Sequence, residues 1–189
     1  MAPHKPKVVS ISHPSWAGKE YLQEFESKFN LHHKLTKRQV VTPGDRKTTV
    51  ANLAAKVQAE GPFDAILILM GIGPYEPFDE ELLRPLVPHC KIMASASAGY
   101  NEFDVDWMTR NGILFCNSRS AVNEATADMA ILMMLGILRD VQRLQTSIAN
   151  GTWRGGLAPS RDPSGLKLGI IGMGAIGKAR TLNPDGLPI

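Results

Sequence analysis

The chain has 189 residues, of which 43% are hydrophobic and 21% are charged, and its formal net charge at pH 7 is +3. These values are typical of a soluble globular protein, and the length suits one domain or one and a fraction. Basic residues are scattered apart from small clusters such as residues 34–38, which excludes the basic stripe of a nucleic-acid-binding or membrane-surface protein.

Short apolar runs bounded by turn residues predict five strands. These runs lie at residues 7–11, 39–41, 64–70, 91–95 and 113–116. The run at 64–70 is almost continuously apolar, which is typical of a strand covered on both faces. Helical segments alternate with the runs, so roughly the first 115 residues predict an α/β fold with a parallel, helix-covered sheet.

The expected helices are amphipathic or bounded by capping residues. The first presents an apolar face made by Tyr21, Leu22, Phe25 and Phe29. Thr49 is expected to cap the next helix, which Gly61 and Pro62 end. Further helices begin near Asp79 and span residues 105–110.

One long helix is predicted over residues 121–150, with Ser120 or Asn123 as its cap. Its segment 129–138 is wholly apolar but only ten residues long, which is too short to span a bilayer. We therefore interpret it as a buried helix. Residues 151–165 are rich in glycine and proline and predict a linker.

The most informative stretch follows this linker. Residues 166–171 form an apolar run that predicts a buried strand, and Gly172, Gly174 and Gly177 then spell G-x-G-x-x-G where the strand would turn into a helix. Gly172 would permit the tight turn, Gly174 would let the backbone approach a pyrophosphate, and Gly177 would let helix and strand pack closely. The alternative is a glycine-rich turn without a ligand.

A rival pattern overlaps the fingerprint. Residues 172–178 also fit the phosphate-binding frame G-x-x-x-x-G-K, but Ala179 replaces the Ser or Thr that would hold Mg²⁺, which disfavours an ATPase. A dinucleotide-binding fold also needs a ribose-reading residue about twenty positions beyond the glycines. This sequence stops at Ile189, so we expect the second domain to be unfinished.

Other features predict a cytoplasmic protein with a ligand site on its sheet. The first residues lack the apolar core of a signal peptide, and Cys90 and Cys116 form no C-x-x-C motif, so reduced thiols are expected. Parallel sheets bind ligands at the carboxyl ends of their strands, which places residues 69–73 and 97–100 at a candidate site. The pair His32 and His33 is interpreted as a solvated helix end, and no metal site is predicted.

Several motifs, in a fixed order, resemble the D-isomer-specific 2-hydroxyacid dehydrogenases. They are A-S-A-G-Y-N at 96–101, D-V-D at 104–106, N-G-I at 111–113, E-A-T-A-D at 124–128, W-R-G at 153–155 and the glycine fingerprint at 172–177. The likeness runs from about residue 7 to residue 178. The phrase G-P-Y-E-P-F at 73–78 looks most like the branch of glyoxylate/hydroxypyruvate reductases and mandelate dehydrogenases, particularly its fungal members.

The resemblance implies a fold and an activity. It implies a flavodoxin-like substrate lobe over residues 1–119 and the start of a Rossmann-type NAD(P)-binding domain over residues 120–189. The implied reaction is hydride transfer from NADH or NADPH to the carbonyl carbon of a small 2-keto acid, which gives a D-2-hydroxy acid. The family usually forms dimers, so a homodimer is the implied assembly.

The resemblance also implies site residues. The substrate side comprises Leu69, Met70, Gly71, Ser97, Ala98 and Gly99, in which the backbone N–H groups of Ala98 and Gly99 would hold the substrate carboxylate as an anion nest. The cofactor side comprises Thr126, Gly172, Met173, Gly174, Ala175, Ile176 and Gly177. The plainer alternatives are a first-turn helix residue for Thr126, a strand end for residues 69–71 and a simple turn for residues 98–99.

No catalytic residue is assigned. The family's catalytic arginine, glutamate and histidine follow the glycine fingerprint at a distance that this sequence does not reach, and the resemblance itself stops after residue 178. We therefore expect a truncated chain that is inactive by itself. The alternative is a non-enzymatic fragment that pairs with a full-length relative.

Overall fold

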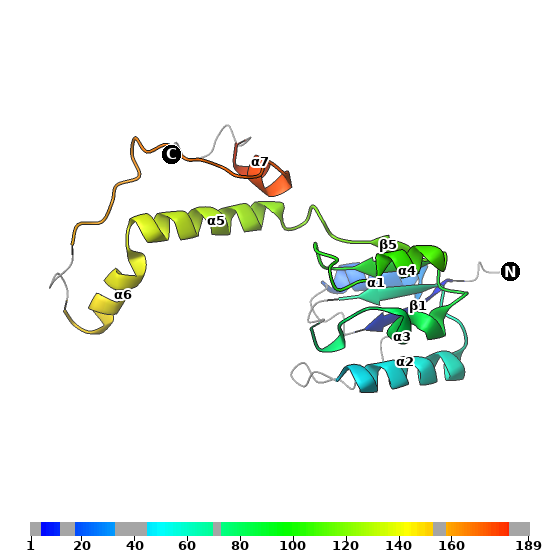
Figure 1. Ribbon diagram of the computed structural model, residues 1–189. Helices are drawn as coiled ribbons and strands as arrows, with labels where there is room; N and C mark the ends of the chain where they lie inside the picture. Colours follow the sequence, from blue (N-terminus) through cyan, green and yellow to red (C-terminus); the bar gives the residue numbers. More distant parts are fainter. Residues whose placement is uncertain (1–4, 12–17, 33–44, 70–72, 153–157, 182–189) are drawn as a thin grey trace. The chain divides into compact units, whose positions relative to one another are not determined.

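The computed structural model describes residues 5–11, 18–32, 45–69, 73–152 and 158–181. The chain divides into two compact units, residues 1–119 and residues 120–189 (Figure 1). The first unit holds a parallel sheet with its helices, and the regular secondary structure described in the second unit is helical.

The first unit is built on a five-stranded parallel sheet. Its strands are β1 (Lys7–Ile11), β2 (Asn30–His32), β3 (Ala65–Ile68), β4 (Ile92–Ser95) and β5 (Leu114–Cys116). Their order is β2-β1-β3-β4-β5, and every neighbouring pair is parallel. The predicted α/β fold is confirmed. The predicted strand at 39–41 lies outside the described residues, and the second strand of the sheet is β2.

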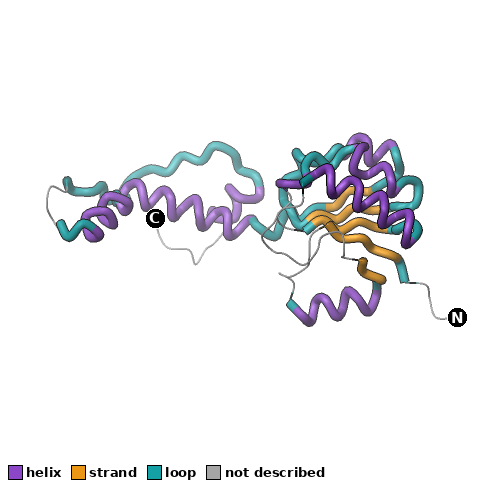
Figure 2. Tube along the Cα trace, turned by 90° about the horizontal axis from the view of Figure 1, so that it is seen from below, coloured by secondary structure: helices purple, strands orange, loops and turns teal. Residues whose placement is uncertain are grey.

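The helices of this unit lie on both faces of the sheet (Figure 2). They are α1 (Lys19–Lys28), α2 (Arg46–Glu60), α3 (Glu80–Leu83) and α4 (Val105–Arg110), with the short 3₁₀ helices η1 (Gly73–Tyr75) and η2 (Arg84–Leu86). Helix α1 lies on one face, and α2, α3 and α4 lie on the other. Because the strands alternate their side chains between faces, each face collects its own apolar set.

The main core lies between the sheet and α2, α3 and α4. Ile66 and Met93 reach it from the strands, and Leu53, Leu82 and Met108 reach it from the three helices, all fully buried. The opposite face is less covered: α1 buries no residue completely, and Tyr21, expected on its apolar face, is 74% exposed. At the sheet edge, Leu114 of β5 is 69% exposed.

Helix α2 begins one turn earlier than the sequence suggested. Its cap is Asp45, whose Oδ1 accepts a hydrogen bond from the Thr48 backbone N–H at 2.6 Å. Thr49 was expected as the cap, but it lies inside the helix and donates its hydroxyl to the Asp45 carbonyl at 3.1 Å. Asp is among the strongest capping residues, so the local chemistry favours it over a threonine four positions later. Gly61 ends the helix as predicted.

The second unit corrects the prediction of one long helix. It contains α5 (Asn123–Leu138) and α6 (Val141–Ala149), separated at Asp140, whose φ of 52° and ψ of 42° are left-handed. Asp tolerates this conformation better than most residues, because its short polar side chain bonds locally. The Arg161 N–H donates to the Leu138 carbonyl at 2.9 Å, which satisfies one acceptor at the end of α5.

Two further expectations for this unit are wrong. The residue before α5 is Val122, which makes no side-chain cap, so neither Ser120 nor Asn123 caps the helix. The segment 129–138 is not buried in this chain: Met129, Leu132, Met133 and Ile137 are all more than half exposed. Within the described ranges, no helix is both long enough and apolar enough to cross a membrane.

The run before the glycine fingerprint forms no strand. Residues 166–171 have no regular secondary structure, and Leu168 and Ile171 are exposed. A strand needs a hydrogen-bonding neighbour, and the described part of the second unit contains no strand to pair with this run. The helix after the glycines does form: α7 (Ala175–Thr181) contacts α5.

Candidate functional site

The candidate site is the edge of the first unit's sheet where β3, β4 and β5 end. The register pairs Ile68 with Ser95 and Ala94 with Cys116, so the three strands deliver their following loops side by side. This is the edge at which parallel sheets bind ligands. Of the predicted substrate residues, Leu69 is half-buried here, and Met70 and Gly71 lie outside the described residues.

The loop after β4 is held by a chain of serine hydroxyls. The Ser97 hydroxyl donates to the Gly99 carbonyl at 2.8 Å, and the Ser97 N–H donates to Ser95 Oγ at 3.1 Å. Ser95 Oγ and Ser97 Oγ are 2.7 Å apart. Since the Ser97 proton is used on Gly99, Ser95 must be the donor to Ser97 Oγ.

This loop exposes two backbone donors. Among the described residues, nothing accepts a hydrogen bond from the N–H groups of Ala98 and Gly99, whereas Asn117 and Ser118 occupy neighbouring carbonyls of the same loop. Ala98 is half-buried and Gly99 is exposed. Two adjacent free N–H groups form a concave donor pair that suits a carboxylate or another small anion.

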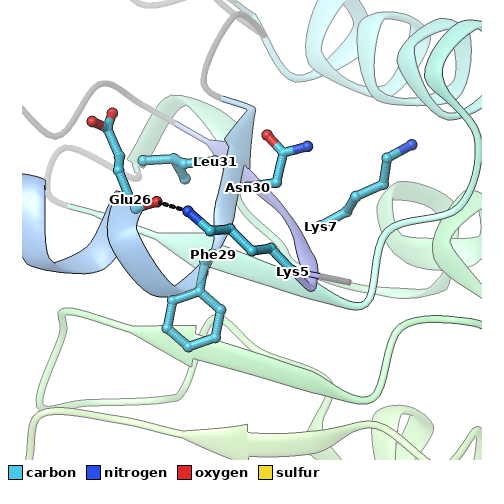
Figure 3. Close-up of a pocket in the computed structure, with 6 residues that line it drawn as sticks. All are labelled: Lys5, Lys7, Glu26, Phe29, Asn30 and Leu31. Carbon is cyan, nitrogen blue, oxygen red and sulfur yellow. Dashed lines mark hydrogen bonds between the residues drawn. The ribbon is translucent and has the colours of Figure 1, made fainter. Parts of the chain in front are cut away.

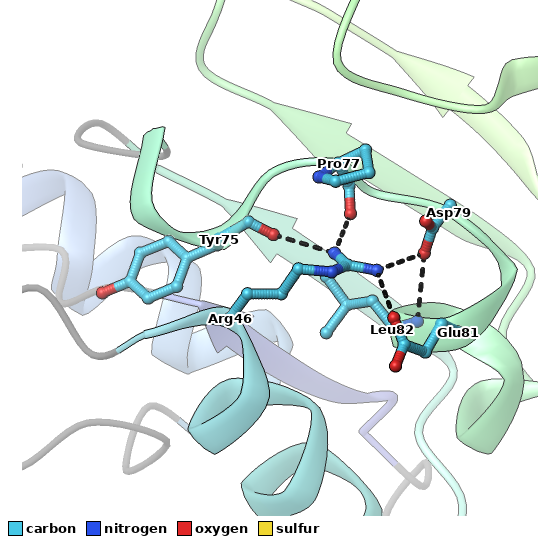
Figure 4. A network of polar contacts seen from close by, with 6 residues as sticks. All are labelled: Arg46, Tyr75, Pro77, Asp79, Glu81 and Leu82. Atoms are coloured by element: carbon cyan, nitrogen blue, oxygen red, sulfur yellow. Dashed lines mark hydrogen bonds and ion pairs between the residues drawn. The ribbon is translucent and has the colours of Figure 1, made fainter.

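The loop after β3 is fixed by one arginine from the start of α2 (Figure 4). Arg46 Nη1 donates to the Tyr75 carbonyl at 3.2 Å and also to the Pro77 carbonyl. Its Nη2 bonds Asp79 Oδ1 at 2.6 Å and Glu81 Oε2 at 3.0 Å. The planar guanidinium therefore ties the loop and the start of α3 to α2.

The loops after β3 and β4 also bind each other. Phe78 and Phe103 form a parallel bridge, and their rings stack with centroids 4.6 Å apart. The Phe78 N–H donates to the Glu102 carbonyl at 2.7 Å. Both rings are buried, so this contact closes the core beneath the candidate site.

Sequence reasoning placed residues 97–99 at the site but missed Arg46, Asn117 and Ser118. The only signal for the last two is their position directly after the fifth predicted strand, where polar side chains reach the carboxyl edge. Nothing local marks Arg46, because its partners are 29 to 35 residues further along the chain.

In the second unit the glycine fingerprint has the geometry of a tight turn. Gly172 has a φ of 94°, and a Cβ on Gly177 would collide with the Gly172 carbonyl oxygen. A Cβ on Gly174 would meet nothing within 4 Å, which leaves room for a ligand beside that backbone. Gly172 and Gly177 thus need to be glycine for the turn itself, and Gly174 does not.

The other predicted cofactor residues are exposed and lie near this turn. Met173 and Ile176 are 49% and 43% exposed, and Ala175 begins α7. The Thr126 hydroxyl donates to the Val122 carbonyl of its own helix at 2.7 Å. This contact is the ordinary one for a threonine in the first turn of a helix.

The two described histidines lie away from the edge where β3, β4 and β5 end. His32 is in β2, level with Val9 in the middle of β1, so its interpretation as a solvated helix end is wrong. His32 Nδ1 pairs with Glu60 Oε2 at 2.5 Å near the end of α2, and His89 is exposed before β4 begins. A hydrogen bond from Lys56 lowers the pKa of Glu60 and the His32 contact adds to the effect, although burial acts in the opposite direction. Burial raises the pKa of the Cys90 thiol.

A surface hollow of about 400 Å³ lies at the opposite, amino edge of the sheet (Figure 3). It is lined by Lys5, Lys7, Glu26, Phe29, Asn30 and Leu31. Both ammonium groups are used internally, since Lys5 Nζ donates to the Glu26 carbonyl at 3.0 Å and Lys7 Nζ donates to the Glu60 carbonyl. Because the hollow lies at the amino edge of the sheet, it is separate from the candidate site at the carboxyl edge.

Comparison with known proteins identifies relatives over most of the chain. Dehydrogenase efuE from Hormonema carpetanum is 52% identical over 172 residues, which are 91% of this chain and 41% of that protein. The crystal structure of a glyoxylate reductase from Paecilomyes thermophila matches with a TM-score of 0.76 and 31% identity, over 93% of this chain and 51% of that one.

A third match extends the likeness of fold. The apo D-mandelate dehydrogenase of Rhodotorula graminis gives a TM-score of 0.66 at 23% identity, over 78% of this chain and 41% of that one. The chain thus spans about two fifths to one half of the length of these three proteins. The model of the family described as D-isomer specific 2-hydroxyacid dehydrogenase, catalytic domain, matches residues 9–181. As its motifs predicted, the chain belongs to the D-isomer-specific 2-hydroxyacid dehydrogenases.

Proposed function

We propose that this chain provides the substrate lobe and the glycine turn of an NAD(P)H-dependent reductase of small 2-keto acids. The observation that carries the proposal is the pair of free N–H groups at Ala98 and Gly99 on the carboxyl edge of the sheet. They match the carboxylate that every 2-keto acid carries. Glyoxylate, hydroxypyruvate and aryl glyoxylates are the proposed substrates, and D-2-hydroxy acids are the products.

The residues proposed to contact the substrate side chain belong to the same edge of the sheet. Leu69 leads out of β3 beside the loop at 97–99, and residues 69–71 are proposed to contact the substrate side chain. The Arg46 bonds hold the far end of this loop at Tyr75 and Pro77. An aliphatic side chain such as that of Leu69 suits contact with a small substrate.

The cofactor is proposed to bind at the glycine turn. The positive φ of Gly172 and the close approach at Gly177 fit the turn that a dinucleotide needs, and the open space at Gly174 fits the approach of a pyrophosphate. When bound, NADH or NADPH supplies the hydride.

No residue of this chain is proposed as the proton donor. His32 is engaged with Glu60, and His89 lies before β4 rather than at the carboxyl edge. We propose that the chain alone binds ligands weakly and does not turn them over. The proposed location is the cytoplasm, where Cys90 and Cys116, both free thiols, would stay reduced.

A fluorescence titration with NADH and NADPH, followed by assays of glyoxylate and hydroxypyruvate reduction, tests the proposal. We expect weak dinucleotide binding and no turnover. Gly174→Ala should abolish the binding without unfolding the chain, because the added methyl group has space in the protein but occupies the place of the pyrophosphate. Gly136→Ala, where a methyl group also meets nothing within 4 Å, is the matched control. Turnover would contradict the absence of a proton donor, and equal binding by both variants would contradict the cofactor site.

A second candidate is a non-enzymatic role in which this chain pairs with another copy or with a full-length relative. The observation in its favour is the exposed apolar surface of α5 and α6, made by Met129, Leu132, Met133, Ile137, Leu144 and Ile148. Surfaces of this kind mark association sites. Sedimentation of the purified chain and co-purification with a relative test it, and a monomer that captures no relative would contradict it.

A further inference from the structure

We propose that Asn117 is a positioning residue that aims the two N–H groups of the carboxylate site. This inference rests on the proposed carboxylate site at Ala98 and Gly99. Asn117 follows β5 and has no role in the functions assigned above, yet its side-chain Nδ2 donates to the Ala98 carbonyl at 2.8 Å in a partly buried position.

The planarity of the peptide bond gives this hydrogen bond its effect. The Ala98 carbonyl and the Gly99 N–H belong to one trans peptide, so they point in opposite directions and turn together. When Asn117 holds the carbonyl, it also fixes the direction of the Gly99 N–H. Without the bond, this peptide could rotate about its flanking φ and ψ angles, and Gly99 permits a wide range of them.

The neighbouring peptide is held from the same side. The Ser118 backbone N–H donates to the Ser97 carbonyl at 3.0 Å, and that carbonyl shares its peptide with the Ala98 N–H. The Ser118 hydroxyl adds a bond to the Ser95 carbonyl at 3.2 Å. Two consecutive residues after β5 thus hold the two peptides whose N–H groups face the substrate.

The loop's remaining acceptor is occupied as well. The Gly99 carbonyl accepts the Ser97 hydroxyl, so the carbonyls of Ser97, Ala98 and Gly99 are all bonded within the protein. A carboxylate near the loop therefore meets N–H donors rather than unpaired carbonyl oxygens, which would repel it. Asn117 holds the Ala98 carbonyl through its side chain, from the segment that follows β5, so a substitution can remove this hydrogen bond alone.

The chain supplies a matched control in Asn111. Its Nδ2 also donates to a backbone carbonyl, that of Trp107, at 2.8 Å in a partly buried position. Asn111 precedes β5 and lies at the opposite edge of the sheet. Asn117→Ala and Asn111→Ala therefore remove the same kind of hydrogen bond and should destabilise the first unit by similar amounts, which urea unfolding checks.

The test uses ¹H–¹⁵N spectra of the full 189-residue chain titrated with glyoxylate. In the unmodified chain, glyoxylate should shift the Ala98 and Gly99 resonances. Asn117→Ala should weaken this binding roughly tenfold, because a charge-assisted bond to the carboxylate loses its alignment. Asn111→Ala should bind glyoxylate as the unmodified chain does. Equal affinity in the Asn117 and Asn111 variants would overturn the inference.

A ligand-free measurement separates this inference from the proposed function. The ¹⁵N order parameter of Gly99 should be near the rigid value of about 0.85 in the unmodified chain and should fall below about 0.6 in Asn117→Ala only. If glyoxylate moves neither resonance in the unmodified chain, the proposed carboxylate site fails and the order parameters alone decide the inference. An order parameter that Asn117→Ala leaves unchanged would overturn it.

Discussion

The two units of this chain contrast in how their apolar residues are used. In residues 1–119 the apolar runs become paired strands, and helices α2, α3 and α4 cover them, so Phe63, Phe78 and Met93 are fully buried. In the described part of residues 120–189, apolar runs remain exposed, as Ile137 and Ile171 show. Hydrophobic patterning therefore yields a core only where the chain also supplies the neighbouring element.

The contrast is visible in backbone hydrogen bonds as well. Strand β3 pairs on both sides, with β1 and with β4, so its backbone groups are satisfied within the sheet. The run at 166–171 is the corresponding feature of the second unit, and in the described residues it pairs with no strand. The Leu166 N–H donates to the Pro163 carbonyl, and water is the partner left for the groups that no strand pairs with.

The largest expected effect compares a buried apolar residue of the first unit with an exposed apolar residue of the second. Phe63→Ala should lower the free energy of unfolding by about 3–5 kcal/mol, because it empties a fully buried site beside His32. Ile171→Ala should change it by no more than about 0.5 kcal/mol, since Ile171 is exposed. Urea unfolding followed by circular dichroism measures both. A large loss of unfolding free energy in Ile171→Ala would contradict the contrast between the two units.

The next effect compares two arginines. Arg46→Ala should cost about 2–3 kcal/mol, because it removes charge-assisted bonds to the Tyr75 and Pro77 carbonyls and to Asp79. Arg143→Ala in the second unit removes an i,i+3 pair with Asp140 that is about half exposed, and should cost about 0.3–0.5 kcal/mol. The same unfolding measurement applies, and similar losses for the two variants would contradict the assigned role of Arg46.

The smallest expected effect concerns how the stability of the first unit depends on pH. The pKa of Glu60 is lowered, chiefly by Lys56, so its ionised form stabilises the fold above the ordinary value of 4.5, and this stability is lost as the pH falls below it. Glu60→Gln should therefore flatten the decline of the urea midpoint between pH 7 and pH 4. Glu24→Gln is the control, because Glu24 forms a pair with Lys28 that is more than half exposed, and screening should make its contribution smaller. An unchanged decline in Glu60→Gln would show that other carboxylates dominate.

Much of the first unit could be predicted because its signals are local. The runs that became β1, β3, β4 and β5 are apolar and bounded by turn residues, and helix α4 begins and ends at the predicted residues 105 and 110. The loop at 97–99 could be placed because a parallel sheet brings its strand ends to one edge. These inferences need only a few neighbouring residues at a time.

The parts that failed depend on partners distant in the chain or on a single backbone angle. Arg46 and Asn117 act on carbonyls 31 and 19 residues away, which no local pattern reveals. The break between α5 and α6 depends on one left-handed residue, Asp140, within an otherwise helical pattern. The run at 166–171 has strand composition, but composition does not supply a second strand.

The exposed run at 166–171 also affects how the chain behaves in concentrated solution. Leu166, Leu168, Ile170 and Ile171 are exposed in this six-residue segment, and short segments rich in such side chains stack between molecules into cross-β assemblies. Lys167 and Gly169 interrupt it, and a charge of this kind acts as a gatekeeper against stacking. Lys167→Val would remove the gatekeeper, so light scattering should rise at protein concentrations that the unmodified chain tolerates. The resistance of this protein to aggregation would then depend on one lysine that lies near the glycine turn in the sequence.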